Sequence, residues 1–143
     1  MFVNQVSIFV ENKGGSIADV ISILGENGIN LRALSVADTA DYGILRLICD
    51  EPERALGLVK GKNYTANLTN VLGFTIPDEP NSLGKVLKII NNHHIDITYI
   101  YTFIGHYDGK AVAIIKTTDL ESTKQVLEQN GITILNGSEI YKN

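Results

Sequence analysis

Several features that mark particular classes of protein are scarce or missing in this chain of 143 residues. It has one cysteine, Cys49, so no disulfide can form within it, and the apolar run 44–49 predicts a buried, unreactive thiol. No apolar stretch approaches the roughly 20 residues that a membrane-spanning helix needs. The first residues show neither the basic nor the long apolar region of a signal peptide. We therefore expect a cytoplasmic protein with no membrane association.

Motifs for metal binding, phosphate binding or catalysis are also absent from the sequence. There is no CxxC or HxxxH spacing, so the three histidines His93, His94 and His106 are not predicted to bind a metal. The segment 13–16 contains two glycines but matches neither GxxxxGK[ST] nor GxGxxG. No nucleophile lies beside a histidine and a carboxylate in a recognisable arrangement. We expect a protein without cofactor, metal or enzymatic activity.

Positive charge is scarce as well. Lysine and arginine number 12 against 16 aspartate and glutamate residues, which gives a net charge of −4 and a pI near 5.3. Proteins that bind nucleic acid usually present a basic surface, so this balance argues against a nucleic-acid partner. Hydrophobic residues make up 44% of the chain, enough for a folded core.

What the chain does contain is an internal repeat: residues 6–70 and 72–141 read as two copies of one unit, offset by about 66 positions. The clearest matches place four residues of the first copy opposite four of the second: Ser16 and Ser82, Val20 and Val86, Ile23 and Ile89, Ile29 and Ile95. Repeats of this size indicate two similar small domains or two halves of one domain. We expect domains at 1–70 and 71–143.

Each copy shows the same order of predicted elements. In the first copy we expect strands at 2–10, 29–37, 42–49 and 64–70 and helices at 17–26 and 52–60. In the second we expect strands at 71–76, 95–104, 110–117 and 132–141 and helices at 83–92 and 120–130. The buried face of the first helix is predicted to hold Ile17, Val20, Ile21 and Leu24. The order βαββαβ predicts an α+β fold of two ferredoxin-like sandwiches in tandem, each an antiparallel sheet with helices on one face.

Two short motifs in each copy resemble the ACT domain, a regulatory module that binds amino acids. The first is the turn before the first helix, 12–17 in one copy and 78–83 in the other; the second is 28–31 and 94–97, which resemble Gly-Ile-Asn-Ile. The family's turn carries proline and then glycine. The first copy keeps the glycine as Gly15 but has Gly14 at the proline position, whereas the second keeps Pro80 but has Asn81 at the glycine position. The two sites therefore need not be equivalent.

The chemistry of the turn predicts a ligand site independently of the family resemblance. A glycine-containing turn that enters a helix leaves backbone N–H groups unpaired, and with the helix dipole these favour an anion such as a carboxylate. Side-chain oxygens nearby, from Glu11, Asn12 and Asn30 or from Asp78, Glu79 and Asp96, would accept hydrogen bonds from an amino group. The same residues also fit a purely local role, in which the glycines only turn the chain and Asn12 or Asp78 only caps a helix.

The resemblance implies a set of ligand-binding residues in both copies: Asn12, Gly14, Gly15, Ser16, Asn30, Asp78, Asn81 and Asp96. It also implies a non-enzymatic sensor of a small amino acid or related metabolite, with the ligand at the interface between ACT-like domains. The alternative is a regulatory subunit or interaction module that controls a biosynthetic enzyme through its sheet surface without a ligand.

Three aromatic residues, Tyr99, Tyr101 and Phe103, alternate along one strand and so share one sheet face. RNA-recognition modules of the same topology stack bases on such residues. The acidic charge and the absence of their basic glycine–aromatic third strand favour packing across an interface between domains or subunits. We accordingly expect a homodimer.

Overall fold

The computed structural model describes residues 2–11, 15–38, 41–103 and 105–141. The chain forms two compact units: the first unit comprises residues 4–69, and the second unit comprises residues 70–141 together with Phe2 and Val3. No helix in these described ranges is long and apolar enough to cross a membrane.

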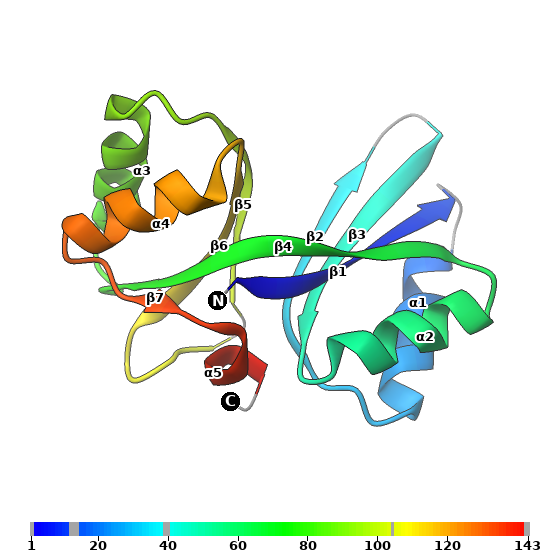
Figure 1. The fold of residues 1–143 in the computed structure, drawn as a ribbon. Helices are drawn as coiled ribbons and strands as arrows, with labels where there is room; N and C mark the ends of the chain where they lie inside the picture. Colours follow the sequence, from blue (N-terminus) through cyan, green and yellow to red (C-terminus); the bar gives the residue numbers. More distant parts are fainter. Residues whose placement is uncertain (1, 12–14, 39–40, 104, 142–143) are drawn as a thin grey trace. The chain divides into compact units, whose positions relative to one another are not determined.

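The first unit has the predicted βαββαβ order. Its elements are β1 (Val3–Glu11), α1 (Ser16–Glu26), β2 (Leu31–Asp38), β3 (Tyr42–Cys49), α2 (Pro52–Gly61) and the first part of β4 (Thr65–Ile76). The sheet order is β2-β3-β1-β4, and β3 runs antiparallel to both β1 and β2. Helices α1 and α2 pack together on one face of this sheet (Figure 1).

The core of the first unit lies between this sheet and its helices. Strand residues such as Ile8 and Leu47 are fully buried against Val20 and Leu24 of α1. Cys49 belongs to the same core, as predicted, and burial raises the pKa of its thiol to about 11, which keeps it protonated and unreactive.

Helix α1 is bounded by two glycines in left-handed conformation. Gly15 is the N-cap residue in left-handed conformation, with φ at +92°. At the other end Gly28 has φ +77°, its N–H bonds to the Gly25 carbonyl, and the Ile29 N–H bonds to the Leu24 carbonyl at 3.0 Å. This is a Schellman motif, which ends a helix by using its last carbonyl groups.

The buried face of α1 differs from the prediction at its first residue. Ile17 is 40% exposed, whereas Ser16, Val20 and Leu24 are buried. The buried stripe therefore follows a spacing of four residues from Ser16, so that Ile17 lies beside it.

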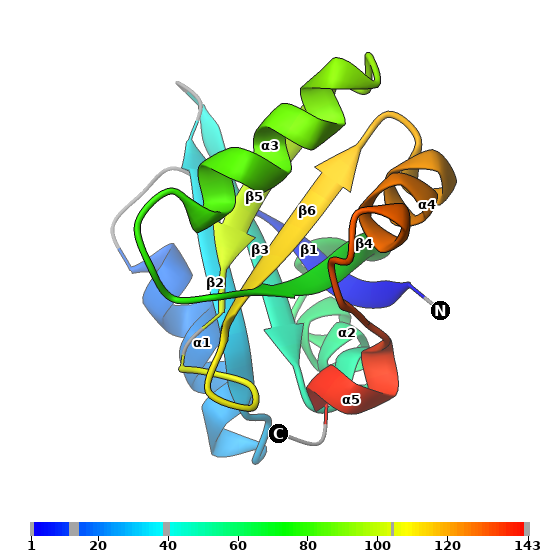
Figure 2. The same cartoon turned by 90° about the vertical axis from the view of Figure 1, so that its left-hand side faces the viewer.

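The second unit repeats the order, and β4 serves as the last strand of the first unit and the first strand of the second. The further elements are α3 (Ser82–Asn92), β5 (Ile97–Thr102), β6 (Ala111–Thr117), α4 (Leu120–Gln129), β7 (Ile134–Leu135) and α5 (Gly137–Tyr141). Strand β6 pairs antiparallel with β4 and β5, and β7 pairs with β4. Helices α3 and α4 lie together in front of β4, β5 and β6 in Figure 2.

The predictions at the ends of the two copies are wrong in two respects. The separate strands expected at 64–70 and 71–76 are one continuous strand, β4. The strand expected at 132–141 is the two-residue β7 followed by α5. A capping box explains α5, because the Glu139 N–H bonds to Asn136 Oδ1 at 3.2 Å and the Asn136 N–H bonds to Glu139 Oε1 at 3.2 Å.

Candidate functional site

The entry to α1 is the starting point of the site. The first backbone hydrogen bond of the helix runs from the Asp19 N–H to the Gly15 carbonyl at 2.8 Å. The N–H groups of residues 16–18 precede this bond, so they have no carbonyl within the helix to pair with. A Cβ built on Gly15 would meet no atom within 4 Å, so the space around this residue is open. Together with the helix dipole, this end of α1 favours an anion.

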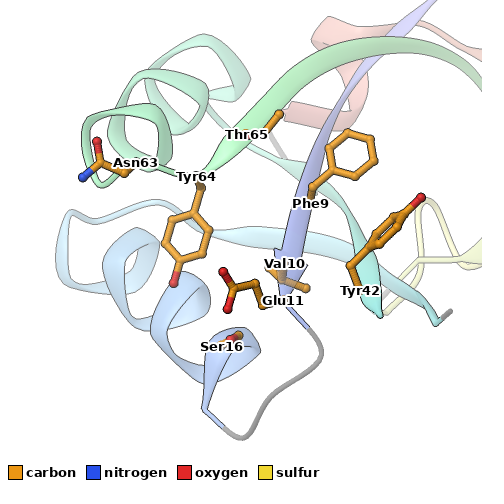
Figure 3. Close-up of a pocket in the computed structure, with 8 residues that line it drawn as sticks. All are labelled: Phe9, Val10, Glu11, Ser16, Tyr42, Asn63, Tyr64 and Thr65. Carbon is orange, nitrogen blue, oxygen red and sulfur yellow. The ribbon is translucent and has the colours of Figure 1, made fainter. Parts of the chain in front are cut away.

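A cavity of about 300 Å³ adjoins this helix end within the first unit. Its lining comes from the end of β1, the start of α1, the start of β3 and the segment between α2 and β4: Phe9, Val10, Glu11, Ser16, Tyr42, Asn63, Tyr64 and Thr65. We call it the first-unit cavity; Figure 3 shows its lining side chains.

The lining combines opposite chemical characters. The carboxylate of Glu11 points between the ring of Tyr64 and Ser16 at the start of α1 (Figure 3). Phe9 and Tyr42 form a tilted ring pair with centroids 6.1 Å apart, and they remain 37% and 45% exposed. The helix end and the Glu11 carboxylate thus lie on one side of β1, whereas the rings of Phe9 and Tyr42 lie on its other side (Figure 3).

Only some of the ligand-binding residues predicted in the first copy lie at this cavity. Ser16 lines the cavity and Gly15 directly precedes it, whereas Asn12 and Gly14 lie outside the described residues. Asn30 follows the far end of α1, about 16 Å along a helix of 11 residues. There its backbone N–H donates to Asp50 Oδ1 at 3.0 Å, and its carbonyl accepts from the Asp50 N–H at 3.2 Å. Within one unit, Asn30 and Gly15 are therefore not brought together.

The corresponding helix end of the second unit is covered by its own residues. Asn81 takes the left-handed conformation of Gly15, with φ at +66°, as its residue type allows. A Cβ on Gly84 would lie 2.5 Å from Asn81 Oδ1, so the Asn81 side chain occupies the space over the first turn of α3. The Ser82 N–H already donates to the Glu79 carbonyl at 3.3 Å.

Asp78 of the second unit is held by a neighbouring loop. His106 Nε2 lies 3.0 Å from Asp78 Oδ2, and both side chains are exposed. This contact ties the turn before α3 to the segment between β5 and β6. The remaining candidate, Asp96, lies beyond the other end of α3, where its carbonyl accepts from the Thr118 N–H at 3.1 Å.

The side chains around the two helix entries also differ. Tyr64 follows α2 with its N–H bonded to the Val59 carbonyl, and Ile132 follows α4 with its N–H bonded to Leu127 in the same way. The repeat offset that joins Ser16 to Ser82 places Pro77 at the position of Glu11. The second unit therefore lacks both the carboxylate and the phenol of the first-unit cavity.

A second cavity of about 370 Å³ lies in the second unit, at the end of α3 and the start of α4. Most of its lining is polar: His93, His94, Ile95, Thr118, Asp119, Ser122, Gln125, Val126 and Gln129. Asp119 caps α4 by accepting from the Ser122 N–H at 3.1 Å, and its hydrogen bonds with Ser122 lower its pKa. This carboxylate already occupies the start of the helix. None of the eight predicted residues lines this cavity.

Metal binding finds no support in the described part of the chain, where no three histidine, cysteine, aspartate or glutamate side chains cluster suitably. His93 instead hydrogen-bonds the Ile89 carbonyl at 2.9 Å, a local contact at the end of α3. Alternation predicts that Tyr99 and Tyr101 share one sheet face, and their rings stack there with centroids 6.3 Å apart.

Three aromatic residues of the first-unit cavity, Phe9, Tyr42 and Tyr64, were not among the residues predicted from sequence. Phe9 and Tyr42 are 33 positions apart in the chain, but their strands β1 and β3 are adjacent in the sheet. In this pairing Glu11 of β1 lies opposite Tyr42 of β3. The signal available in the sequence was the alternation of Phe9 and Glu11 at the end of the first strand, next to the glycine turn.

Comparison with known proteins gives the family. The family model for the ACT domain pair matches residues 1–142. A crystal structure of a protein from Bacteroides thetaiotaomicron is similar over 100% of this chain and 98% of that one, with 34% identity and a TM-score of 0.91. The ligand-free regulatory subunit of aspartate kinase from Thermus thermophilus has the same fold at 15% identity, with a TM-score of 0.62 over 90% of this chain and 93% of that one.

A third similar structure is an aspartate kinase from Clostridium acetobutylicum, at 14% identity and a TM-score of 0.51. The match covers 90% of this chain and 32% of that one. A search of the curated proteins found no match. The family match spans nearly the whole sequence and agrees with the two βαββαβ units, so the chain belongs to the ACT domain pair family.

Proposed function

We propose that the chain is a non-enzymatic regulatory protein that binds a small amino acid in the first-unit cavity. The observation that carries the proposal is the pairing of an open helix entry at Gly15 with the Glu11 carboxylate across one small cavity. An α-amino acid is a zwitterion, so it presents a carboxylate to the N–H groups of α1 and an ammonium group to Glu11. Membership of the ACT domain pair family supports this reading.

The proposed binding residues of this site are Gly15, Ser16 and Glu11, and the predicted roles of Asn12 and Gly14 stay predictions. Asn30 and Asp96 lie at the opposite ends of their helices, so each would reach a bound amino acid only from another ACT-like domain. Asp78 and Asn81 are engaged locally, by His106 and by the first turn of α3. We therefore place the ligand in the first unit.

A thermal-shift screen of the twenty amino acids tests the proposal. Ligand at about 100 times its dissociation constant stabilises the native state by roughly 2.7 kcal/mol if the unfolded chain does not bind. For a chain of this size that corresponds to a rise in melting temperature of about 5–10 °C. No shift with any amino acid at millimolar concentration would contradict the proposal.

A second candidate function is control of an enzyme through the sheet, which the exposed apolar residues of β2 favour. Leu34 and Val36 are 38% and 46% exposed on a strand at the end of the sheet order. Such a strand presents free backbone groups and apolar side chains to a partner, including a second copy of the chain. The regulatory subunits of aspartate kinase share this fold. Light scattering distinguishes a homodimer from a monomer, and a Val36→Lys variant tests whether β2 makes the contact.

A further inference from the structure

We infer that the first-unit cavity selects an amino acid whose side chain carries an oxygen atom over one of the same shape without it, and that the Tyr64 hydroxyl makes this selection. The inference rests on the proposed function and adds the class of ligand and the residue that recognises it. It concerns the side of the cavity lined by Glu11, Ser16 and Tyr64, which the rings of Phe9 and Tyr42 do not share (Figure 3).

Ser16 marks the place for the carboxylate of the ligand. This residue is only 5% exposed, and its hydroxyl has no hydrogen-bond partner among the described residues, although it lines the cavity. A hydroxyl so well buried normally has a partner, because burial without one costs free energy. Ser16 is the first residue of α1, where backbone N–H groups are also left unpaired. The oxygen atoms of a carboxylate would accept hydrogen bonds from both kinds of donor.

Tyr64 is brought to the cavity by the way in which α2 ends. Asn63 takes a left-handed conformation with φ at +69°, and its N–H donates to the Lys60 carbonyl at 3.0 Å. The Tyr64 N–H donates to the Val59 carbonyl at 3.1 Å, which completes a Schellman motif. The ring of Tyr64 is partly buried and packs against the core of the first unit. The position of its phenol group is therefore set by the fold.

The hydroxyl at the tip of this ring has no partner in the protein either. Figure 3 shows it pointing toward the start of α1, on the side where Glu11 and Ser16 lie. No hydrogen bond joins it to another residue in the described part of the chain. Water can satisfy this hydroxyl while the cavity is open, but a bound ligand would displace that water.

Three groups thus face three parts of an amino acid. The start of α1 with Ser16 faces the carboxylate, Glu11 faces the ammonium group, and Tyr64 is left to face the side chain. A side-chain oxygen accepts a hydrogen bond from the phenol, whereas an apolar side chain in the same place covers the hydroxyl and leaves it unpaired. Sites that contain such a polar group reject ligands that cannot pair with it.

This recognition is confined to the first unit. The second unit has Ile132 after α4, in the place that Tyr64 takes after α2. The second-unit cavity also has no tyrosine among its described lining residues.

Isothermal titration calorimetry on the full chain tests the selectivity with two pairs of amino acids of matched shape. L-threonine is compared with L-valine, and L-asparagine with L-leucine. In each pair we expect the member with the side-chain oxygen to bind at least about fivefold more tightly, because its partner leaves the Tyr64 hydroxyl unpaired.

Two pairs of variants locate the selectivity. Tyr64→Phe removes only the hydroxyl and should cancel most of the difference within each pair, mainly by weakening L-threonine and L-asparagine. Its control, Tyr101→Phe, removes the hydroxyl of another half-buried tyrosine that does not line the cavity, and should leave the difference unchanged. Ser16→Ala should weaken all four ligands by a similar factor, because the carboxylate is common to them. Its control is Ser82→Ala, at the equivalent start of α3.

The outcomes separate the inference from the function on which it rests. If L-valine and L-leucine bind as tightly as L-threonine and L-asparagine, or if the thermal screen finds only amino acids without a side-chain oxygen, the selectivity is wrong and the amino-acid site survives. An undiminished difference in Tyr64→Phe would overturn the role of Tyr64. If no amino acid gives heat of binding or a thermal shift, both the inference and the proposed function fail.

Discussion

Replacement of Gly15 by valine separates backbone strain from loss of the ligand site. Gly15 has φ +92°, a conformation that costs a residue with a side chain about 1–2 kcal/mol, and a β-branched residue is especially unfavourable there. We expect Gly15→Val to lower the free energy of unfolding by about 2 kcal/mol. The melting temperature would then fall by about 4–8 °C. The valine side chain would also project into the open space beside the first turn of α1 and hinder a bound carboxylate.

Gly28→Val is the matched control. Gly28 lies at the other end of the same helix with φ +77°, and a Cβ there also meets no atom within 4 Å. The two variants should lose similar stability, whereas Gly15→Val alone should weaken the amino acid identified by the thermal screen by tenfold or more. Calorimetry below both melting temperatures measures this. Equal loss of affinity in the two variants, or wild-type affinity in Gly15→Val, would refute the role of Gly15.

Three further predictions concern the second unit and the acidic surface. Asn81→Val should cost stability because φ is +66°, yet leave amino-acid affinity within about twofold of wild type, as calorimetry would show. The pKa of Asp119 is lower in the native state than its ordinary value of 3.8. The ionised carboxylate therefore stabilises the fold at pH values above 3.8, and this stabilisation is lost as the pH falls through the native pKa. The stability difference between wild type and Asp119→Ala, followed by urea unfolding, should therefore narrow in acid and stay constant near neutrality. Single-stranded RNA should show no micromolar binding at physiological salt in fluorescence anisotropy, despite the stacked Tyr99 and Tyr101.

The sequence predicts the parts of this fold that depend on local periodicity and turn chemistry. The Asn27-Gly28 pair predicts the end of α1, and Pro52 predicts the start of α2. These signals are local, because φ and hydrogen bonding at a helix end are set by a few neighbouring residues.

Other features depend on contacts that the pattern alone does not reveal. The extended backbone is not interrupted near Asn70, so β4 continues through the point where two separate strands were predicted. Helix α5 has a readable signal in Asn136 and Glu139, but β-branched residues at 132–134 favoured a strand. The aromatic lining of the first-unit cavity arises from strand pairing between β1 and β3, which requires the register of the sheet.

A titration followed by ¹H–¹⁵N NMR correlation spectra of the full chain tests the central claim most directly. With the amino acid from the thermal screen, the account predicts saturable shifts in the amide signals of Ser16, Ile17 and Tyr64. The amide signals of Ser82 and Leu83, at the covered entry of α3, should not shift. Saturable shifts at Ser82 and Leu83 without shifts at Ser16 and Ile17 would contradict the account.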